Sequence, residues 1–441
     1  MNASATPSCR SPFARQFGGS LAGLLLVGGL VFGCAQGGGT GNEGSGGETG
    51  GGTGGTGTQT GVGGSTVTPG TGGSGPGATG GKAGGTGGMI GTAGTTGVGG
   101  RTGTGGTTGA GGAGVVTAYW VSTTGSDLNP GTQAAPFATL GHANLFAKPG
   151  VTIWIMPGTY PTTNTVTLAN SGTATTVINV FAAPGTRPVL DYAAQKAMAP
   201  DDNKRGIDII GNYWHIRGFE VKNANDNGIA ISGSNNVVED IITDFCGDTG
   251  IQITVPSAQA GDLTRGAFNT ILNCDSHDNF DVATGGENAD GIDAKLDIGP
   301  GNVFRGCRSW NNSDDGYDLF GVTQVVTIDN CWAMLNGHTA NGQKGPAADG
   351  NGFKLGGNNV PAVHKVTNSF ALTNDTCGFT LNNNTATPSV TGCGVFGNKS
   401  TWCGITHTGD VTITMTTGAT AITLPRVTNA AAGASTLPTI R

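Results

Sequence analysis

The chain has little charge and few aromatic side chains for its length of 441 residues. Charged residues make up 11% of it, aromatic residues 6%, and there are 6 histidines. Acidic side chains outnumber basic ones by 28 to 21, so the protein as a whole repels polyanions. This balance argues against a nucleic-acid partner, and an acidic ligand would need cations gathered at one place.

Long hydrophobic runs are scarce too, with one exception near the N-terminus. Residues 21–32 are mainly apolar and follow Arg10 and Arg15, a pattern typical of a secretory signal peptide and too short and glycine-rich for a membrane span. Cys34 follows a small residue, and the segment resembles a bacterial lipoprotein processing site. An ordinary cleaved signal is the alternative. We expect residues 1–34 to be a lipoprotein-type signal peptide with lipidation at Cys34.

This leader predicts that the protein is exported. It would stay at the cell surface or outer membrane through a lipid on Cys34, or else be secreted. The lipid anchor would be its only contact with a membrane.

Cysteine spacing of the kind that binds zinc is missing. The 9 cysteines include no Cys-X-X-Cys pair and no Cys/His grouping. Four of them share one inward register, where a free cysteine packs as a small hydrophobe: Cys274, Cys307, Cys331 and Cys393. We expect most cysteines to be buried thiols, with Cys377 and Cys403 as the pair most suited to a disulfide.

Glycine, by contrast, is abundant and divides the chain. Between residues 37 and 114, 39 of 78 residues are glycine, and most of the others are threonine, serine or alanine. A segment of this composition cannot build a core. We expect residues 35–114 to be a flexible tether and residues 115–441 to form one domain.

A short phrase recurs within that domain: a glycine followed by an apolar, a polar and an apolar residue. Such repetition is typical of a solenoid, and the alternation predicts one short strand in each copy. The residue two positions after each glycine then points outward, roughly 5 Å from its neighbours on adjacent coils. The copies begin at Gly206, Gly228, Gly250, Gly291, Gly316, Gly352, Gly378 and Gly404. The outward residues are Asp208, Ala230, Gln252, Asp293, Asp318, Lys354, Thr380 and Thr406.

Other patterns complete the expected architecture. Small residues after Asn or Gly, as in Asn273-Cys274, predict another strand per coil, and residues 151–155 form the first clear strand. The alanine-containing stretch that ends at Ala147 predicts a short helix that caps the first coil. The long steps from Gly250 to Gly291 and from Gly316 to Gly352 predict inserted loops, where solenoids usually bind ligands. The sequence therefore predicts an all-β parallel solenoid with an N-terminal capping helix.

Four aspartates surround two of the repeat glycines. Asp290 and Asp315 each precede a glycine directly, and Asp314 and Asp318 flank the second one. Crowded carboxylates repel one another unless a cation joins them, and calcium accepts such oxygen ligands in tolerant geometry. The grouping requires a bend at Gly316, because a straight strand would hold Asp315 and Asp318 about 10 Å apart. Alternatively, these aspartates cap backbone groups in turns.

Lys354 stands beside Asp318 in the outward column, one coil further on. A lone surface lysine is usually a solvated charge. Beside a metal ion its pKa would fall, however, and a neutral amine accepts protons well. Lys354 is therefore a candidate general base.

These motifs resemble those of pectate lyases of polysaccharide lyase family 9. The resemblance rests on residues 288–291, 302–318 and 349–357 and extends from about Tyr119 to Asn398. It implies a right-handed parallel β-helix with Ca²⁺ as cofactor and Lys354 as catalytic base. The calcium ligands that it implies are Asp290, Asp314, Asp315 and Asp318. Asp293 departs from the family pattern, in which a small residue is expected, and its role stays open.

The resemblance also implies a substrate and a reaction. The substrate would be an acidic polysaccharide such as pectate, cleaved by β-elimination after Lys354 removes the proton on carbon 5. Lys295, Arg305 and Arg308 are weaker candidates for binding further carboxylates of the substrate. We expect a monomer.

Two other functions remain open. A galacturonan hydrolase also uses paired aspartates on a β-helix, although no Gly-His-Gly or Arg-Ile-Lys motif accompanies Asp314 and Asp315. A non-catalytic solenoid that binds carbohydrate or acts as an adhesin would use the same aspartates for structural calcium or turns.

Overall fold

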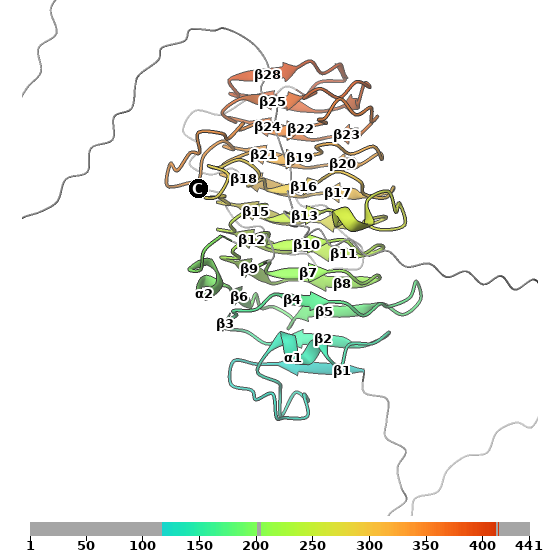
Figure 1. Ribbon diagram of the computed structural model, residues 1–441, viewed down its shortest axis with the longest axis vertical. Coiled ribbons are helices and arrows are strands. Elements are labelled where there is room, and N and C mark those ends of the chain that lie inside the picture. The colour runs from blue at the N-terminus through green and yellow to red at the C-terminus, as the bar shows by residue number, and fades with distance from the viewer. Residues whose placement is uncertain (1–116, 201–203, 412, 414–441) are drawn as a thin grey trace, which may run out of the picture. The chain divides into compact units, whose positions relative to one another are not determined.

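The structure is a computed structural model that describes residues 117–200, 204–411 and 413. The predicted signal peptide, Cys34 and the predicted tether lie outside these residues. In the described part, 29 strands and three short helices form a parallel β-helix whose coils stack along one axis (Figure 1). No helix there is long and apolar enough to cross a membrane.

Each complete coil contributes one strand to each of three parallel sheets, and β1 and β29 extend only the first of them. Sheet A contains β1 (Ala118–Val121), β2 (Thr152–Ile155), β5 (Ile178–Ala182), β8 (Trp214–Arg217), β11 (Val237–Glu239), β14 (Thr270–Leu272), β17 (Val303–Arg305), β20 (Thr327–Asp329), β23 (Lys365–Thr367), β26 (Ser389–Thr391) and β29 (His407–Thr408). Sheet B contains β3 (Thr159–Pro161), β6 (Val189–Asp191), β9 (Glu220–Lys222), β12 (Ile242–Asp244), β15 (Asp275–His277), β18 (Arg308–Trp310), β21 (Trp332–Met334), β24 (Phe370–Leu372) and β27 (Gly394–Phe396). Sheet C contains β4 (Val166–Leu168), β7 (Ile207–Ile209), β10 (Ile229–Ile231), β13 (Ile251–Ile253), β16 (Ile292–Ala294), β19 (Tyr317–Asp318), β22 (Phe353–Lys354), β25 (Cys377–Thr380) and β28 (Ser400–Cys403).

The repeat glycines from Gly206 to Gly352 lie directly before strands of sheet C. The small residues that follow Asn or Gly, such as Cys274 after Asn273, lie at the corner between sheets A and B. Asn273 has φ of 53°, and the following Cys274 is fully buried. The same left-handed corner recurs at Gly306, Asn330, Asn368 and Gly392. Since each corner joins two strands, a coil has three strands where the sequence predicts two.

The first coil is capped by α1 (Leu140–Asn144), as predicted. Thr139 caps this helix by accepting the N–H of His142, and Leu140 is buried. One strand that the sequence analysis does not predict, β1, precedes the strand predicted at residues 151–155 and pairs with it. The remaining helices are α2 (Ala193–Lys196) and η1 (Ser257–Gln259).

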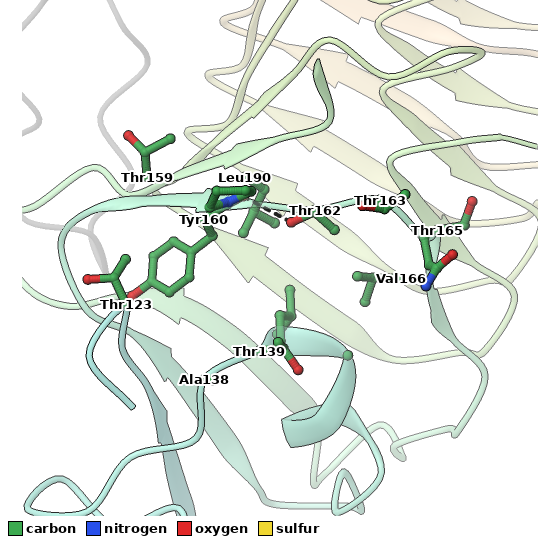
Figure 2. Close-up of a pocket in the computed structure, with 14 residues that line it drawn as sticks. Thr123, Ala138, Thr139, Thr159, Tyr160, Thr162, Thr163, Thr165, Val166 and Leu190 are labelled. Atoms are coloured by element: carbon green, nitrogen blue, oxygen red, sulfur yellow. Dashed lines mark hydrogen bonds between the residues drawn. The ribbon is translucent and has the colours of Figure 1, made fainter. Parts of the chain in front are cut away.

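A cavity of about 470 Å³ lies beside this cap (Figure 2). Threonine hydroxyls from Thr123 to Thr165 surround it, and Leu140, Val166 and Leu190 supply its apolar wall. No charged residue lines it. The cavity therefore offers nothing that would attract an anionic polysaccharide.

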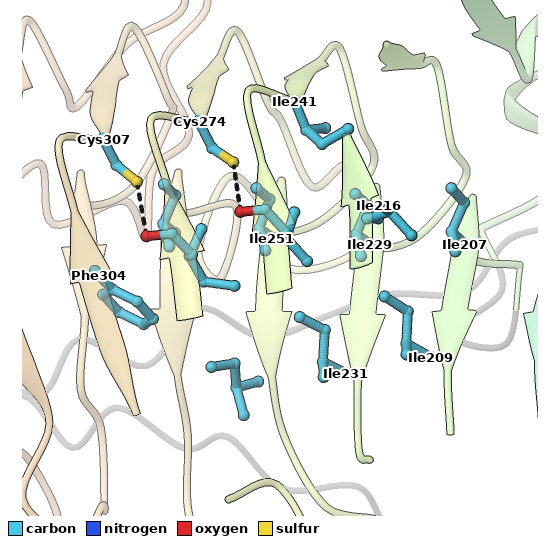
Figure 3. Packing of buried hydrophobic residues seen from close by; sticks show 14 of the residues in the cluster. Ile207, Ile209, Ile216, Ile229, Ile231, Ile241, Ile251, Cys274, Phe304 and Cys307 are labelled. Atoms are coloured by element: carbon cyan, nitrogen blue, oxygen red, sulfur yellow. Dashed lines mark hydrogen bonds between the residues drawn. The ribbon is translucent and has the colours of Figure 1, made fainter. Parts of the chain in front are cut away.

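Inward-facing side chains form continuous columns inside the coils. Isoleucines fill the column of sheet C in the middle of the chain, where Ile207, Ile229 and Ile251 follow one another (Figure 3). Aromatic rings take over towards the C-terminus and stack at 4.6–4.8 Å. This stack consists of Tyr317, Phe353, Phe379 and Trp402. Such columns bury apolar surface in every coil and supply the core.

Stacked asparagines, all buried except the half-buried Asn398, form two further columns. After the first member of each column, every side-chain carbonyl accepts the backbone N–H of the asparagine one coil before, as in the 3.2 Å bond from Asn312 N to Asn336 Oδ1. One column consists of Asn236, Asn269 and Asn302. The other consists of Asn279, Asn312, Asn336, Asn374 and Asn398. These bonds satisfy backbone groups at the corners, where no strand partner is available.

The cysteine prediction is confirmed for the described residues. Cys377 and Cys403 form a disulfide across a Cα–Cα distance of 6.1 Å. The other described cysteines are buried thiols: Cys246, Cys274, Cys307, Cys331 and Cys393.

The last predicted repeat, at Gly404, is wrong. The strand of that coil is β28, which ends before Gly404, and Thr380 pairs with Cys403 instead of Thr406. Trp402 takes the inward place beside Phe379. Gly404 has φ of 76° and lies after the strand, so it serves the turn.

Candidate metal and catalytic site

Three neighbouring strands of sheet C carry the outward column that the repeat predicts. Asp293 in β16 is the register partner of Asp318 in β19, which in turn partners Lys354 in β22. Tyr317 and Phe353 point inward from the same strands. The alternation within each strand therefore brings carboxylates and an amine to adjacent outward positions.

Glycine precedes these strands because the coils approach each other closely. A Cβ on Gly316 would lie 2.6 Å from the carbonyl oxygen of Gly352, which is too near for any side chain. The backbone bends at Gly316, as predicted, although the φ of this residue is not positive. The bend brings oxygens of Asp315 and Asp318 within 4.8 Å of each other.

Each aspartate before a glycine uses one oxygen to cap the next coil. Asp290 Oδ1 accepts the backbone N–H of Asp315 at 3.0 Å, and Asp315 Oδ1 accepts that of Asn351 at 2.6 Å. The Oδ2 atoms of both residues are buried and receive no hydrogen bond, and neither does Asp318 Oδ1. Asp290, Asp315 and Asp318 each offer an oxygen within 4.8 Å of the others. Buried carboxylate oxygens grouped in this way suit a hard cation such as Ca²⁺.

Asp314 differs from the other three predicted ligands. Its Oδ1 accepts the N–H of Asp349 at 2.6 Å, and its Oδ2 accepts that of Asn288 at 3.2 Å. Asp314, Asp315 and Asp349 form a second cluster, in which each residue offers an oxygen within 4.8 Å of the others. Burial, reinforced by Asp290, raises the pKa of Asp314 to about 8. The four predicted ligands are thus neighbours, but both oxygens of Asp314 already accept backbone hydrogen bonds.

Lys354 extends into the middle of these carboxylates. Its Nζ lies 3.3 Å from Asp315 Oδ2 and 3.5 Å from Asp318 Oδ2. Burial acts to lower the pKa of Lys354, but the surrounding carboxylates, Asp318 first among them, raise it well above its usual value. The residue is only 8% exposed, so this part of the column is not a solvated face. Another cation at this place would offset part of the negative charge and so lower the pKa of the amine.

Asp349 belongs to the site although the sequence pattern does not identify it. Its Oδ2 lies 3.4 Å from Lys354 Nζ, and 40% of its side chain is exposed. It stands three residues before Gly352, whereas Asp290 and Asp315 stand directly before their repeat glycines. Its position depends on the path of the preceding loop, which no periodicity in the sequence describes.

Two loops border the site, as the long repeat steps predict. One precedes β16 and spans residues 278–291, and the other precedes β22 and spans residues 335–352. They contact each other where Ala340 N–H donates to Asp278 Oδ1 at 2.7 Å. Asp290 and Asp349 stand near the ends of these loops, so the loops and the carboxylates share one side of sheet C.

Lys295 lies in the same cluster and is not on the outer surface. Its Nζ is 2.8 Å from Asp290 Oδ2, 3.4 Å from Asp293 Oδ2 and 3.5 Å from Asp318 Oδ2. Burial acts to lower the pKa of Lys295, but Asp290 and Asp293 raise it well above its usual value. This lysine faces the carboxylates of the protein, in contrast to the role of binding substrate carboxylates suggested by the sequence.

The two arginines suggested for substrate binding lie elsewhere. Arg305 projects from sheet A and pairs with Asp329 at 3.1 Å. Arg308 is fully buried on sheet B, where its Nε donates to Asp275 Oδ1 at 2.7 Å. The structure brings neither of them to Lys354, and an enclosed guanidinium cannot contact a polysaccharide chain.

The cavity beside the N-terminal cap is also remote from this site. Its wall includes β4, which is separated from β19 by four strands of sheet C. Five strand spacings correspond to roughly 24 Å. The candidate chemistry therefore lies in the carboxylate cluster and not in the cavity.

Comparison with known proteins finds relatives that match more than half of this chain. Pectate lyase L of Paenibacillus polymyxa (strain SC2) is 41% identical over 261 residues, which cover 58% of this chain and 56% of the relative. The crystal structure of pectate lyase Pel9A has 33% sequence identity and a TM-score of 0.57, over 67% of this chain and 76% of that one. A structure of a rhamnogalacturonan lyase has 29% identity and a TM-score of 0.52, over 64% and 73% of the two chains.

The chain thus spans little more than half the length of the Paenibacillus relative. A family model described as the Pel9A-like, right handed beta helix region matches residues 119–410. This range contains every strand of the described fold except the first residue of β1. The chain belongs to the Pel9A-like family of right-handed β-helices.

Proposed function

We propose that this protein is a calcium-dependent pectate lyase that cleaves polygalacturonate by β-elimination. The observation that carries the proposal is the position of Lys354, whose Nζ lies 3.3 Å from Asp315 and 3.5 Å from Asp318. Beside it are three carboxylates with buried oxygens that lack hydrogen bonds. Family membership and the similarity to pectate lyases support the same activity.

Asp290, Asp315 and Asp318 would hold the calcium ion, with Asp314 as the fourth ligand if one of its backbone bonds opens. Bound calcium would supply a Lewis acid that neutralises the uronate carboxylate and so makes the carbon-5 proton more acidic. The backbone caps made by Asp290 Oδ1 and Asp315 Oδ1 fix these side chains between adjacent coils. This arrangement preorganises the ligands.

Lys354 would accept the carbon-5 proton at Nζ. The electrons of the broken C–H bond then form the carbon 4–carbon 5 double bond, and the glycosidic oxygen leaves from carbon 4. Lys354 is held by Asp315 and Asp318 on the preceding coil and by Asp349 on its own coil. A base positioned in this way typically contributes about 10²–10⁴ in rate.

The activity is tested by incubating the protein with polygalacturonate and following the ultraviolet absorbance of the unsaturated product. We expect unsaturated ends to form at a rate that depends on calcium. A galacturonan hydrolase would release reducing ends without this absorbance, and a binding or adhesive protein would release neither. A panel of related uronans, rhamnogalacturonan included, identifies the preferred substrate.

The metal ligands are tested separately. Asp315→Ala removes one buried carboxylate oxygen and one backbone cap, so it should raise the calcium concentration needed for half-maximal activity. Asp329→Ala on sheet A is the matched control, because Asp329 pairs with Arg305 away from the site. An unchanged calcium requirement in Asp315→Ala would mean that Asp315 only caps the turn.

We also propose that the protein acts outside the cytoplasm as a monomer on an acidic polysaccharide. The support is the N-terminal pattern of basic residues, apolar residues and Cys34. Fatty-acid labelling of the full chain and its loss in Cys34→Ser would test the anchor.

A further inference from the structure

Lys295 is a second cation inside the proposed calcium site. Its side chain is 13% exposed, and its ammonium contacts Asp290 Oδ2 at 2.8 Å and Asp318 Oδ2 at 3.5 Å. The contact with Asp290 is the shortest of the three ion pairs that Lys295 makes. A calcium ion held by the same two aspartates would therefore share their oxygens with an ammonium only a few ångströms away. Two cations at that separation repel each other.

Asp293 also contacts the ammonium of Lys295. Its Oδ2 lies 3.4 Å from Lys295 Nζ. The same oxygen is 2.8 Å from Thr249 Oγ1 and accepts Gln252 Nε2 at 3.1 Å, so the previous coil holds it in place. Asp293 is fully buried but is not among the carboxylates whose oxygens meet within 4.8 Å. Its closest charged partner is thus Lys295.

We propose that Asp293 is a positioning residue that acts through Lys295, and that this pair sets the affinity of the site for calcium. Lys295 weakens calcium binding because it competes for Asp290 and Asp318. Asp293 strengthens calcium binding because it draws the ammonium aside when the ion enters. The inference rests on the proposed calcium site and assigns a role to the carboxylate that departs from the family pattern.

The alternative is that Asp293 binds the metal directly through Oδ1, which has no hydrogen-bond partner. The two roles differ in one respect. A direct ligand strengthens calcium binding whether or not Lys295 is present, whereas a positioning residue does so only through Lys295. A double-mutant cycle separates them, since it measures whether two substitutions act independently.

The experiment measures calcium binding by titration calorimetry in the full chain, without substrate. Lys295→Met should tighten calcium binding roughly tenfold, and Asp293→Asn should weaken it by a similar factor, as expected for the gain or loss of one close charge. In the Lys295→Met background, Asp293→Asn should change the affinity by less than about twofold. Lys344→Met is the matched control, because Lys344 pairs with Asp375 outside the cluster and should leave the affinity unchanged.

Thermal stability provides a second readout, independent of calorimetry. In chelator, Lys295→Met should lower Tm, because Asp290 and Asp318 lose a compensating charge, and added calcium should restore it. If Lys295→Met does not fold, Lys295→Gln carries the same test with a neutral hydrogen-bond donor.

Equal weakening by Asp293→Asn in both backgrounds would overturn the inference and identify Asp293 as a direct ligand. Weaker binding in Lys295→Met would overturn it as well. Absence of calcium binding in the unmodified protein is a different result, because it would overturn the proposed metal site itself.

Discussion

Individual aspartates in this site divide their two oxygens between structure and ligand binding. Asp290 and Asp315 each cap a backbone N–H with Oδ1 and leave Oδ2 without a hydrogen bond. A turn-capping role and a metal-binding role are therefore compatible in one side chain. The sequence presents them as alternatives because spacing identifies a residue and not an atom.

Lys354 is the residue whose replacement should affect catalysis most. Lys354→Ala should lower kcat by at least about 100-fold, because a general base acts in the transition state. Lys354→Arg should rescue poorly, since a guanidinium stays protonated at working pH. Because nearby carboxylates raise the pKa of Lys354, the neutral fraction of the wild-type amine, and with it kcat, should increase towards alkaline pH.

The control for Lys354 is Lys365→Ala, which removes an exposed lysine of β23. Calcium binding should persist in all three variants. Formation of unsaturated product by Lys354→Ala at the wild-type rate would contradict the proposed mechanism.

At the scale of strands, the glycine column predicts where sheet C runs but not where it ends. Gly378 is needed because a Cβ there would lie 2.8 Å from the carbonyl oxygen of Thr401 on the next coil. Among the described residues no strand follows β28 in sheet C, so nothing crowds Thr401, and a glycine is not required. Counting glycines therefore overshoots to Gly404.

The prediction that Arg308 and Lys295 bind substrate fails for a different reason. Alternation along a strand predicts that Arg308 and Lys295 point outward, and outward usually means exposed. Here Arg308 is fully buried with Asp275, and Lys295 is held among aspartates from neighbouring coils. Such burial depends on contacts between residues far apart in the chain, which strand periodicity does not encode.

The asparagine columns provide a test of stability at the element scale. Asn236 Oδ1 accepts the backbone N–H of Trp214 at 2.8 Å, and Asn312 Oδ1 accepts that of Asn279 at 3.3 Å. Asn236→Ala and Asn312→Ala each remove one of these buried acceptors. Each should lower the free energy of unfolding by about 2 kcal/mol. Only Asn312→Ala should also weaken calcium binding, since Asn312 directly precedes the turn with Asp314 and Asp315. Urea unfolding and calorimetry measure the two effects, and equal calcium affinities would show that the turn is rigid without Asn312.

The free energy of unfolding should depend on pH through His364, which lies just before β23. Burial lowers its pKa to about 4, and its Nδ1 accepts the N–H of Val326 at 3.2 Å, which requires the neutral ring. Because the folded pKa is below the unfolded value near 6.5, the stabilisation is complete above pH 6.5 and is lost as pH falls towards 4. Unfolding free energy should decrease by about 2 kcal/mol between pH 7.5 and pH 5 from this group.

His364→Gln keeps a hydrogen-bond acceptor but does not titrate in this range. The variant should lack that part of the pH dependence. Parallel pH profiles for the two proteins would assign the slope to other groups.

At the scale of the β-helix, the apolar core consists of side chains that do not belong to the carboxylate cluster. Apolar columns and stacked rings continue through the coils on both sides of the carboxylates. Lys295 and Lys354 also compensate part of the buried negative charge. Excess chelator should therefore abolish lyase activity reversibly and leave the β-rich circular dichroism spectrum largely intact. Full activity in chelator would argue against the metal, and loss of the spectrum would assign calcium a structural role.

The whole chain should divide functionally where its composition changes. The family match begins at residue 119, and the described fold contains its own cap in α1, whose Leu140 and Ala143 are buried. A segment that is half glycine has few side chains with which to stabilise a core. Removing residues 1–114 should therefore leave kcat and Tm within error of the full chain while releasing the protein from membranes. A truncated protein that does not fold would place the domain boundary upstream of residue 115.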